Sequence, residues 1–203
     1  MTAASHDALE RLSALLAARR EDELDSAMRI AERAAGSTAV EEAIVQSYLF
    51  LGYPVALNAM ARWRALSTEP RPERAEIDRR TWMDRGEEVC ALVYGGQYDR
   101  LRANVRSLHP DMEHWMVEEG YGKVLGRPGL SLLARELCIV ALLTVLDVPR
   151  QLYSHLRGAL NVGGTEEAVD AALEVGLQYA EPAARQRARE TWVAVRARTE
   201  LGG

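Results

Sequence analysis

Apolar residues recur at intervals of three and four along most of the chain. Leu9, Leu12, Leu15 and Leu16 show this spacing near the amino terminus, and residues 132–141 show it again. Such a spacing is typical of an α-helix with one face turned toward a core. Alternating apolar and polar runs of strand length do not occur in the sequence, so the pattern predicts an all-α protein.

Glycine and proline residues mark the expected helix boundaries. Prolines suited to a first helical turn, where a missing N–H costs nothing, are Pro54, Pro110, Pro149 and Pro182. The polar, proline-containing segment 67–76 is the best candidate for a linker. We therefore expect a helical segment over residues 1–75 and a second domain over residues 76–203.

The two segments share an internal repeat. A shift of 128 positions aligns residues 23–54 with residues 151–182 and makes eight of the 32 positions identical. Gly36 and Pro54 fall in register with Gly164 and Pro182. The alignment predicts a helix, a capped turn, a second helix and a third helix that starts at a proline, used twice.

Composition and charge exclude several classes of protein. The chain has 203 residues, of which 48% are hydrophobic and 27% charged, and its net charge is -5 without a basic stripe. Nucleic acid is therefore not an expected partner. The longest apolar run, 137–146, is shorter than the roughly 20 residues that span a bilayer. The amino terminus lacks the apolar stretch of a signal peptide, which predicts a cytoplasmic protein without a membrane partner.

Cysteines and histidines are few. Cys90 and Cys138 lie 48 positions apart among apolar neighbours, which predicts buried thiols rather than a redox pair. His109 and His114 are five positions apart, whereas metal-binding histidines on one helix face are three or four apart. We therefore expect no metal site.

Glu136 and His155 are the strongest candidates for chemistry. They flank the turn at residues 147–149, and an antiparallel hairpin of helices 132–146 and 150–162 would place them at similar heights. Each shares a helix face with apolar residues, so the carboxylate should be paired or have a raised pKa. The pair fits an acid and base in catalysis, or an ion pair that ties two helices together.

Two arginines lie near these residues in the sequence. Arg127 stands in a proline and glycine turn, and Arg135 is adjacent to Glu136. Either guanidinium could hold a substrate carboxylate through two N–H donors. Either could equally be a structural or surface charge.

Several motifs between Asp84 and Ala184 resemble the carboxymuconolactone decarboxylase family. These are Arg85-Gly86, Gly95-Gly96-Gln97-Tyr98, residues 121–130 (YGKVLGRPGL), Arg135-Glu136-Leu137, residues 151–155 (QLYSH), 158–163 (GALNVG), Thr165-Glu166-Glu167 and 179–183 (YAEPA). The resemblance implies an all-α, alkylhydroperoxidase D-like fold with a helical hairpin core and a degenerate repeat. It also implies self-association as a trimer or hexamer.

The wider superfamily includes alkylhydroperoxidase D, in which a CxxC motif lies between the acid and the histidine. Glu136 and His155 match its acid and histidine, but Val148 and Gln151 occupy the two cysteine positions. Thiol-dependent peroxide reduction therefore lacks its nucleophile here. In the amino-terminal repeat, Ala8 and Ala27 fall where Glu136 and His155 would be, so chemistry is expected once per chain.

The resemblance implies cofactor-independent decarboxylation of a small unsaturated lactone or related carboxylic acid. His155 would be the general acid, Glu136 would set its tautomer and charge, and Arg127 or Arg135 would bind a carboxylate. Tyr121 is a further candidate for substrate binding, although family decarboxylases commonly have a tryptophan at this position. The alternatives are a non-catalytic helical oligomer, a small-ligand binding protein, and peroxide reduction through Cys138.

Overall fold

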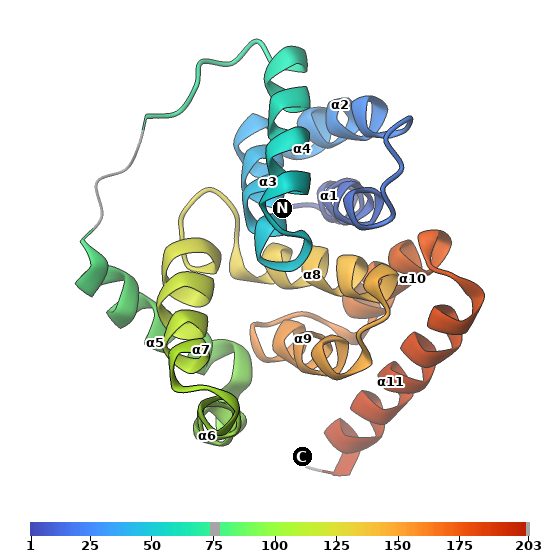
Figure 1. The fold of residues 1–203 in the computed structure, drawn as a ribbon. Coiled ribbons are helices and arrows are strands. Elements are labelled where there is room, and N and C mark those ends of the chain that lie inside the picture. The colour runs from blue at the N-terminus through green and yellow to red at the C-terminus, as the bar shows by residue number, and fades with distance from the viewer. Residues whose placement is uncertain (74–77, 202–203) are drawn as a thin grey trace. The chain divides into compact units, whose positions relative to one another are not determined.

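The computed structural model describes residues 1–73 and 78–201, which form helices and no strands (Figure 1). This confirms the predicted all-α fold. The elements are α1 (Ala3–Ala17), α2 (Leu24–Ala35), α3 (Ser37–Leu51), α4 (Tyr53–Leu66), α5 (Arg79–Tyr94), η1 (Gly95–Gln97), α6 (Tyr98–Leu108), α7 (Pro110–Trp115), η2 (Met116–Leu125), α8 (Leu132–Leu146), α9 (Pro149–Asn161), α10 (Glu166–Tyr179) and α11 (Pro182–Leu201).

The chain divides into two compact units. The first, here called the repeat unit, combines Met1–Thr68 with Gly129–Gly203, and the second, the middle unit, is Glu69–Pro128. The predicted boundary between residues 75 and 76 lies outside the described residues. In the structure, residues 1–68 pack with the last third of the chain rather than forming a domain of their own.

The repeat unit contains the same helical arrangement twice. Helices α2, α3 and α4 correspond to α9, α10 and α11 at the predicted offset, and α1 and α8 add a fourth related pair. α1 and α8 pack against each other, and each also contacts both α3 and α10. This pseudo-symmetric arrangement makes α8 the central helix that carries Glu136.

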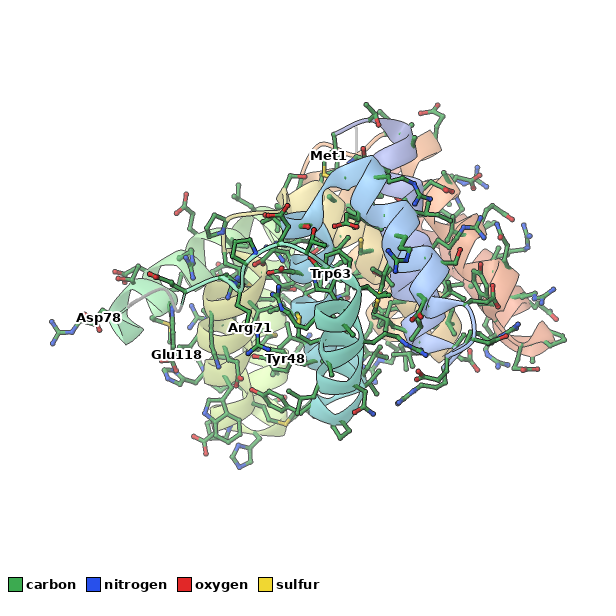
Figure 2. All side chains as sticks on the ribbon, turned by 90° about the horizontal axis from the view of Figure 1, so that it is seen from above. Met1, Tyr48, Trp63, Arg71, Asp78 and Glu118 are labelled. Atoms are coloured by element: carbon green, nitrogen blue, oxygen red, sulfur yellow. The ribbon has the colours of Figure 1, made fainter. Side chains whose placement is uncertain are left out.

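Burial on all sides explains why α8 has so few polar residues. Residues 134–144 of this helix are all buried, since α1, α3, α9, α10 and α11 surround it. A helix without an exposed polar face is expected to lie inside a protein. Trp63, labelled in Figure 2, is likewise fully buried and donates its Nε1–H to Glu41 at 3.3 Å. The core therefore joins both copies of the repeat.

Gly176 allows α10 to approach α8 closely. A Cβ atom at this position would lie 2.6 Å from the Ala141 carbonyl oxygen and 2.7 Å from Thr144 Cβ. We predict that Gly176→Ala lowers the free energy of unfolding by about 1–3 kcal/mol, because the helices must separate. Urea denaturation would measure the change. Gly120→Ala is the control, since no atom lies within 4 Å of its added Cβ, and equal stability of the two variants would contradict the prediction.

The middle unit is built on close contact between α5 and η2, a π-helical segment. A Cβ at Gly86 would lie 2.1 Å from the Val117 carbonyl oxygen, and one at Gly122 would lie 1.8 Å from that of Trp82. Both backbones can therefore approach only because these positions lack side chains. Asp78, labelled in Figure 2, accepts a hydrogen bond from Arg80 N at the start of α5.

No helix among the described residues is both long enough and apolar enough to cross a bilayer.

Candidate acid and histidine pair

The helical hairpin that carries the candidate pair is formed by α8 and α9. Ser131 caps α8 by accepting a hydrogen bond from Ala134 N at 3.3 Å, and Pro149 opens α9. Asp147 makes the turn in a left-handed conformation, with φ of 58°, and its carboxylate pairs with the Arg187 guanidinium. The observed helices agree with the predicted hairpin to within a residue.

Glu136 and His155 meet across this hairpin. His155 Nδ1 lies 2.8 Å from Glu136 Oε2, with the glutamate fully buried and the histidine 6% exposed. When Glu136 is ionised, its carboxylate accepts this hydrogen bond and Nδ1–H donates it. Nε2 is then the ring nitrogen that remains available for a proton transfer.

The immediate surroundings of the pair are apolar on one side and leave one acceptor unused. The Phe50 ring on α3 meets the His155 ring edge-on, with centroids 5.8 Å apart and planes at 80°. Glu136 Oε1 is buried and has no hydrogen-bond partner among the described residues. Most buried polar atoms in proteins have a hydrogen-bond partner, so this carboxylate oxygen could accept a hydrogen bond from a bound molecule.

Arg135 turns away from this pair toward the other copy of the repeat. Its Nη2 donates to Glu42 Oε2 at 2.7 Å, and its Nη1 donates to Gln46 Oε1 at 3.4 Å. The arginine side chain is completely buried, and that of Glu42 is 7% exposed. The guanidinium thus joins α8 to α3.

Tyr121 and Arg127 belong to the middle unit. The Tyr121 hydroxyl donates to the Tyr94 hydroxyl at 3.0 Å, and the tyrosine is 4% exposed. Arg127 follows the end of η2, where its backbone N–H bonds to the Val124 carbonyl at 3.3 Å. The five predicted site residues therefore fall on two units, with Glu136, His155 and Arg135 on the repeat unit.

His109 and His114, which the sequence analysis excluded as metal ligands, make other contacts. His109 caps α7 by accepting from Asp111 N at 3.1 Å, and His114 lies 3.3 Å from Glu118. Within the described ranges no three His, Cys, Asp or Glu side chains gather in a way that could hold a metal ion.

Cys90 and Cys138 are both buried, as predicted. Burial, together with the nearby carboxyl of Glu10, raises the pKa of the Cys138 thiol to about 12. Peroxide reduction requires a thiolate, so Cys138 is poorly suited to that chemistry at neutral pH.

Glu10 is a buried carboxyl that sequence reasoning did not single out. It occupies the position on α1 that corresponds to Cys138 on α8 and is 2% exposed. Burial, assisted by the charge of Asp7, raises the Glu10 pKa from its ordinary 4.5 to about 8. The folded protein therefore holds this proton more tightly than the unfolded chain does.

This binding of a proton predicts a pH-dependent stability. The Glu10 contribution is complete below about pH 4.5 and is lost as pH rises toward 8. Between pH 6 and 8, the free energy of unfolding should fall by roughly 1.4 kcal/mol per pH unit, and Glu10→Gln should remove that slope. Urea denaturation at both pH values tests this. The exposed Glu88→Gln is the control, and identical slopes in both variants would refute the assignment.

Phe50 and Glu42 were also not predicted from the sequence as neighbours of the candidate site residues. Both lie on α3 in the amino-terminal copy, about 90 to 105 positions from the residues that they contact. The internal repeat was the available signal, because it predicts that the two copies pack together. The positions equivalent to the candidate pair, Ala8 and Ala27, are buried alanines that offer no titratable group.

Comparison with known proteins places this hairpin in a family. A sequence model described as the carboxymuconolactone decarboxylase family matches residues 110–192. Peroxisomal protein 2 of Schizosaccharomyces pombe is 32% identical over 144 residues, which cover 68% of this chain and 67% of that protein.

Two further relatives match shorter stretches. Peroxisomal protein 2 of Saccharomyces cerevisiae is 35% identical over 80 residues, which cover 39% of this chain and 28% of that protein. The 4-carboxymuconolactone decarboxylase of Acinetobacter baylyi is 31% identical over 83 residues, or 40% of this chain and 62% of the relative. These matches, the helical fold and the hairpin together show that the chain belongs to the carboxymuconolactone decarboxylase family.

Proposed function

We propose that the protein is a cofactor-independent decarboxylase of a small unsaturated lactone or a related carboxylic acid, with His155 and Glu136 as its acid and base pair. The observation that carries the proposal is the buried hydrogen bond of 2.8 Å between them. The same contact would also be explained by a structural ion pair that ties the two helices together. The unused, buried Glu136 Oε1 favours a site that completes its hydrogen bonds when substrate is present.

The chemistry needs an acid that delivers one proton to carbon. Loss of carbon dioxide leaves the electron pair of the broken carbon–carbon bond in the conjugated system of the substrate, as a dienolate. His155 Nε2–H then protonates that carbon, and the histidine regains its proton from water. Glu136 favours this outcome because its charge balances an imidazolium, the form with protons on both ring nitrogens.

One relative supports the proposed reaction class. It is named 4-carboxymuconolactone decarboxylase, and its match covers 62% of its length. We also propose that Arg127 contributes a carboxylate contact. Arg135 is less suited to this role because Glu42 and Gln46 already engage its guanidinium.

A decarboxylation screen tests the proposal. Purified protein would be incubated with 4-carboxymuconolactone and with a panel of small unsaturated and oxo carboxylic acids, and released carbon dioxide would be measured. Release that depends on the wild-type protein and is lost in a His155→Gln variant supports it. Release from no compound, with the protein folded, favours a non-catalytic helical oligomer or small-ligand binding protein.

Assembly and location are further parts of the proposal. We propose that the chain associates as a trimer or hexamer, which the mass of the protein in solution would reveal. The cytoplasm stays the predicted compartment, although two relatives are named as peroxisomal proteins.

A further inference from the structure

Two arginines, Arg85 and Arg127, lie near the end of η2 in the middle unit. Arg85 projects from α5 and donates its Nε–H to the Gly122 carbonyl at 2.6 Å. Arg127 follows in the turn after η2, close enough that its charge acts on Arg85. Burial, and then the charge of Arg127, lower the pKa of Arg85 from 12.5, although it stays positively charged at neutral pH.

The backbone around the turn fixes this arrangement. Gly126 N donates to the Tyr121 carbonyl at 2.7 Å, which folds the chain back at the end of η2. A Cβ at Gly126 would lie 3.0 Å from Arg85 Cγ and from Val89 Cγ2. The turn thus packs directly on the Arg85 stem, which limits the positions that the guanidinium can take.

One N–H donor of the Arg85 guanidinium makes no hydrogen bond to the described part of the chain. Arg85 Nη2 is buried and lacks a hydrogen-bond partner among the described residues. Among residues 1–73 and 78–201, no carboxylate forms an ion pair with Arg85, and the Gly122 carbonyl is its only hydrogen-bond acceptor. A buried donor on a charged side chain is costly when it makes no hydrogen bond, so an acceptor bound at Arg85 Nη2 would stabilise the site.

We propose that Arg85 and Arg127 form a binding site for the carboxylate of a small organic acid, with Arg85 Nη2 as a donor to the anion. A carboxylate suits the planar guanidinium fork, which can donate two parallel hydrogen bonds. The choice of a carboxylate, rather than another anion, rests on the proposed function. The nearby arginines and the unused Arg85 donor are observed independently of it.

The competing explanation is structural. Carbonyl groups at the end of a helix carry partial negative charge, and arginines near them stabilise the helix. A structural role would make Arg85 matter for stability but not for the recognition of an anion. The test must therefore compare a charged ligand with a neutral one of the same shape.

The test measures binding of 2,4-hexadienoate and of its neutral amide by titration calorimetry. The wild-type protein should bind the acid at least about 10-fold more tightly than the amide, because charge-assisted hydrogen bonds are lost with the amide. Arg85→Ala should weaken binding of the acid by about 10-fold or more and leave binding of the amide unchanged. Arg85→Lys, which keeps the charge but not the fork, should recover only part of the affinity.

Two controls separate the explanations. Arg100→Ala removes an exposed arginine from α6 of the same unit and should leave both affinities unchanged. Arg85→Gln, with a polar side chain on the same backbone, serves if the alanine variant unfolds. The proposal is overturned if wild type binds neither compound, if it binds both equally, or if the Arg85 variants bind the acid as wild type does.

The measurement also distinguishes this inference from the proposed function. His155→Gln should lose turnover but keep its affinity for 2,4-hexadienoate, since binding requires no proton transfer. Affinity that depends on Arg85 in a protein without decarboxylase activity would retain the anion site and reject the reaction. If the Arg85 variants decarboxylate at the wild-type rate and bind 2,4-hexadienoate with unchanged affinity, the anion site is rejected and the reaction is retained.

Discussion

Replacing His155 with glutamine is expected to lower kcat for decarboxylation by about 10² to 10⁴-fold. Glutamine has a similar size and can still hydrogen-bond Glu136, but it cannot donate a proton to a dienolate. Because the substitution is nearly isosteric in a site that is 6% exposed, the fold should persist. KM should change little, since the interaction that is lost forms only in the transition state.

Steady-state kinetics on the substrate identified by the screen would measure this loss. His114→Gln is the matched control because its side chain is 57% exposed and belongs to the middle unit. Glu136→Gln should lower kcat less, because it weakens the support of the imidazolium without removing the acid. A His155→Gln enzyme that works at the full rate would end the assignment of this residue as the general acid.

Breaking the Arg135 and Glu42 pair is expected to destabilise the protein by about 3–5 kcal/mol. Either Arg135→Met or Glu42→Leu would remove one member of a buried ion pair in which the arginine side chain is completely inaccessible. The double variant replaces both charges by apolar groups and should be close to wild type in stability. A strong, non-additive coupling between the two sites is the expected signature.

Chemical denaturation of both single variants and the double variant forms the cycle that measures this coupling. The exposed pair of Arg189 and Glu174, with side chains 59% and 45% accessible, provides the control. Its disruption should cost less than about 1 kcal/mol. Additive effects at Arg135 and Glu42 would show that the two residues stabilise the fold independently.

The helices themselves could be predicted because their boundaries are chemically marked. Pro149 and Pro182 open α9 and α11, and Ser37 opens α3 after Gly36, whose φ is 88°. The positions of Glu136 and His155 on either side of one loop also predicted their contact, since an antiparallel helical hairpin brings residues at similar heights together. Local sequence carries this information.

Other features depend on contacts between distant segments and have no local signal. Glu42 and Arg135 are 93 positions apart, and an acidic residue on a helix usually faces solvent. The π-helix η2 is approached closely by α5 at Gly86, which the sequence shows only as an ordinary glycine. The division into units likewise follows from the packing of α1 on α8, which no linker reveals.

The split of the repeat unit across the chain has a consequence for synthesis on the ribosome. α1 leaves the exit tunnel long before α8, because 114 residues separate the end of one from the start of the other. At about 5–20 residues per second, the leucine face of α1 waits several seconds for its partner. Nascent chains that stall within the middle unit should therefore expose apolar surface and recruit chaperones, whereas chains released after α10 should not.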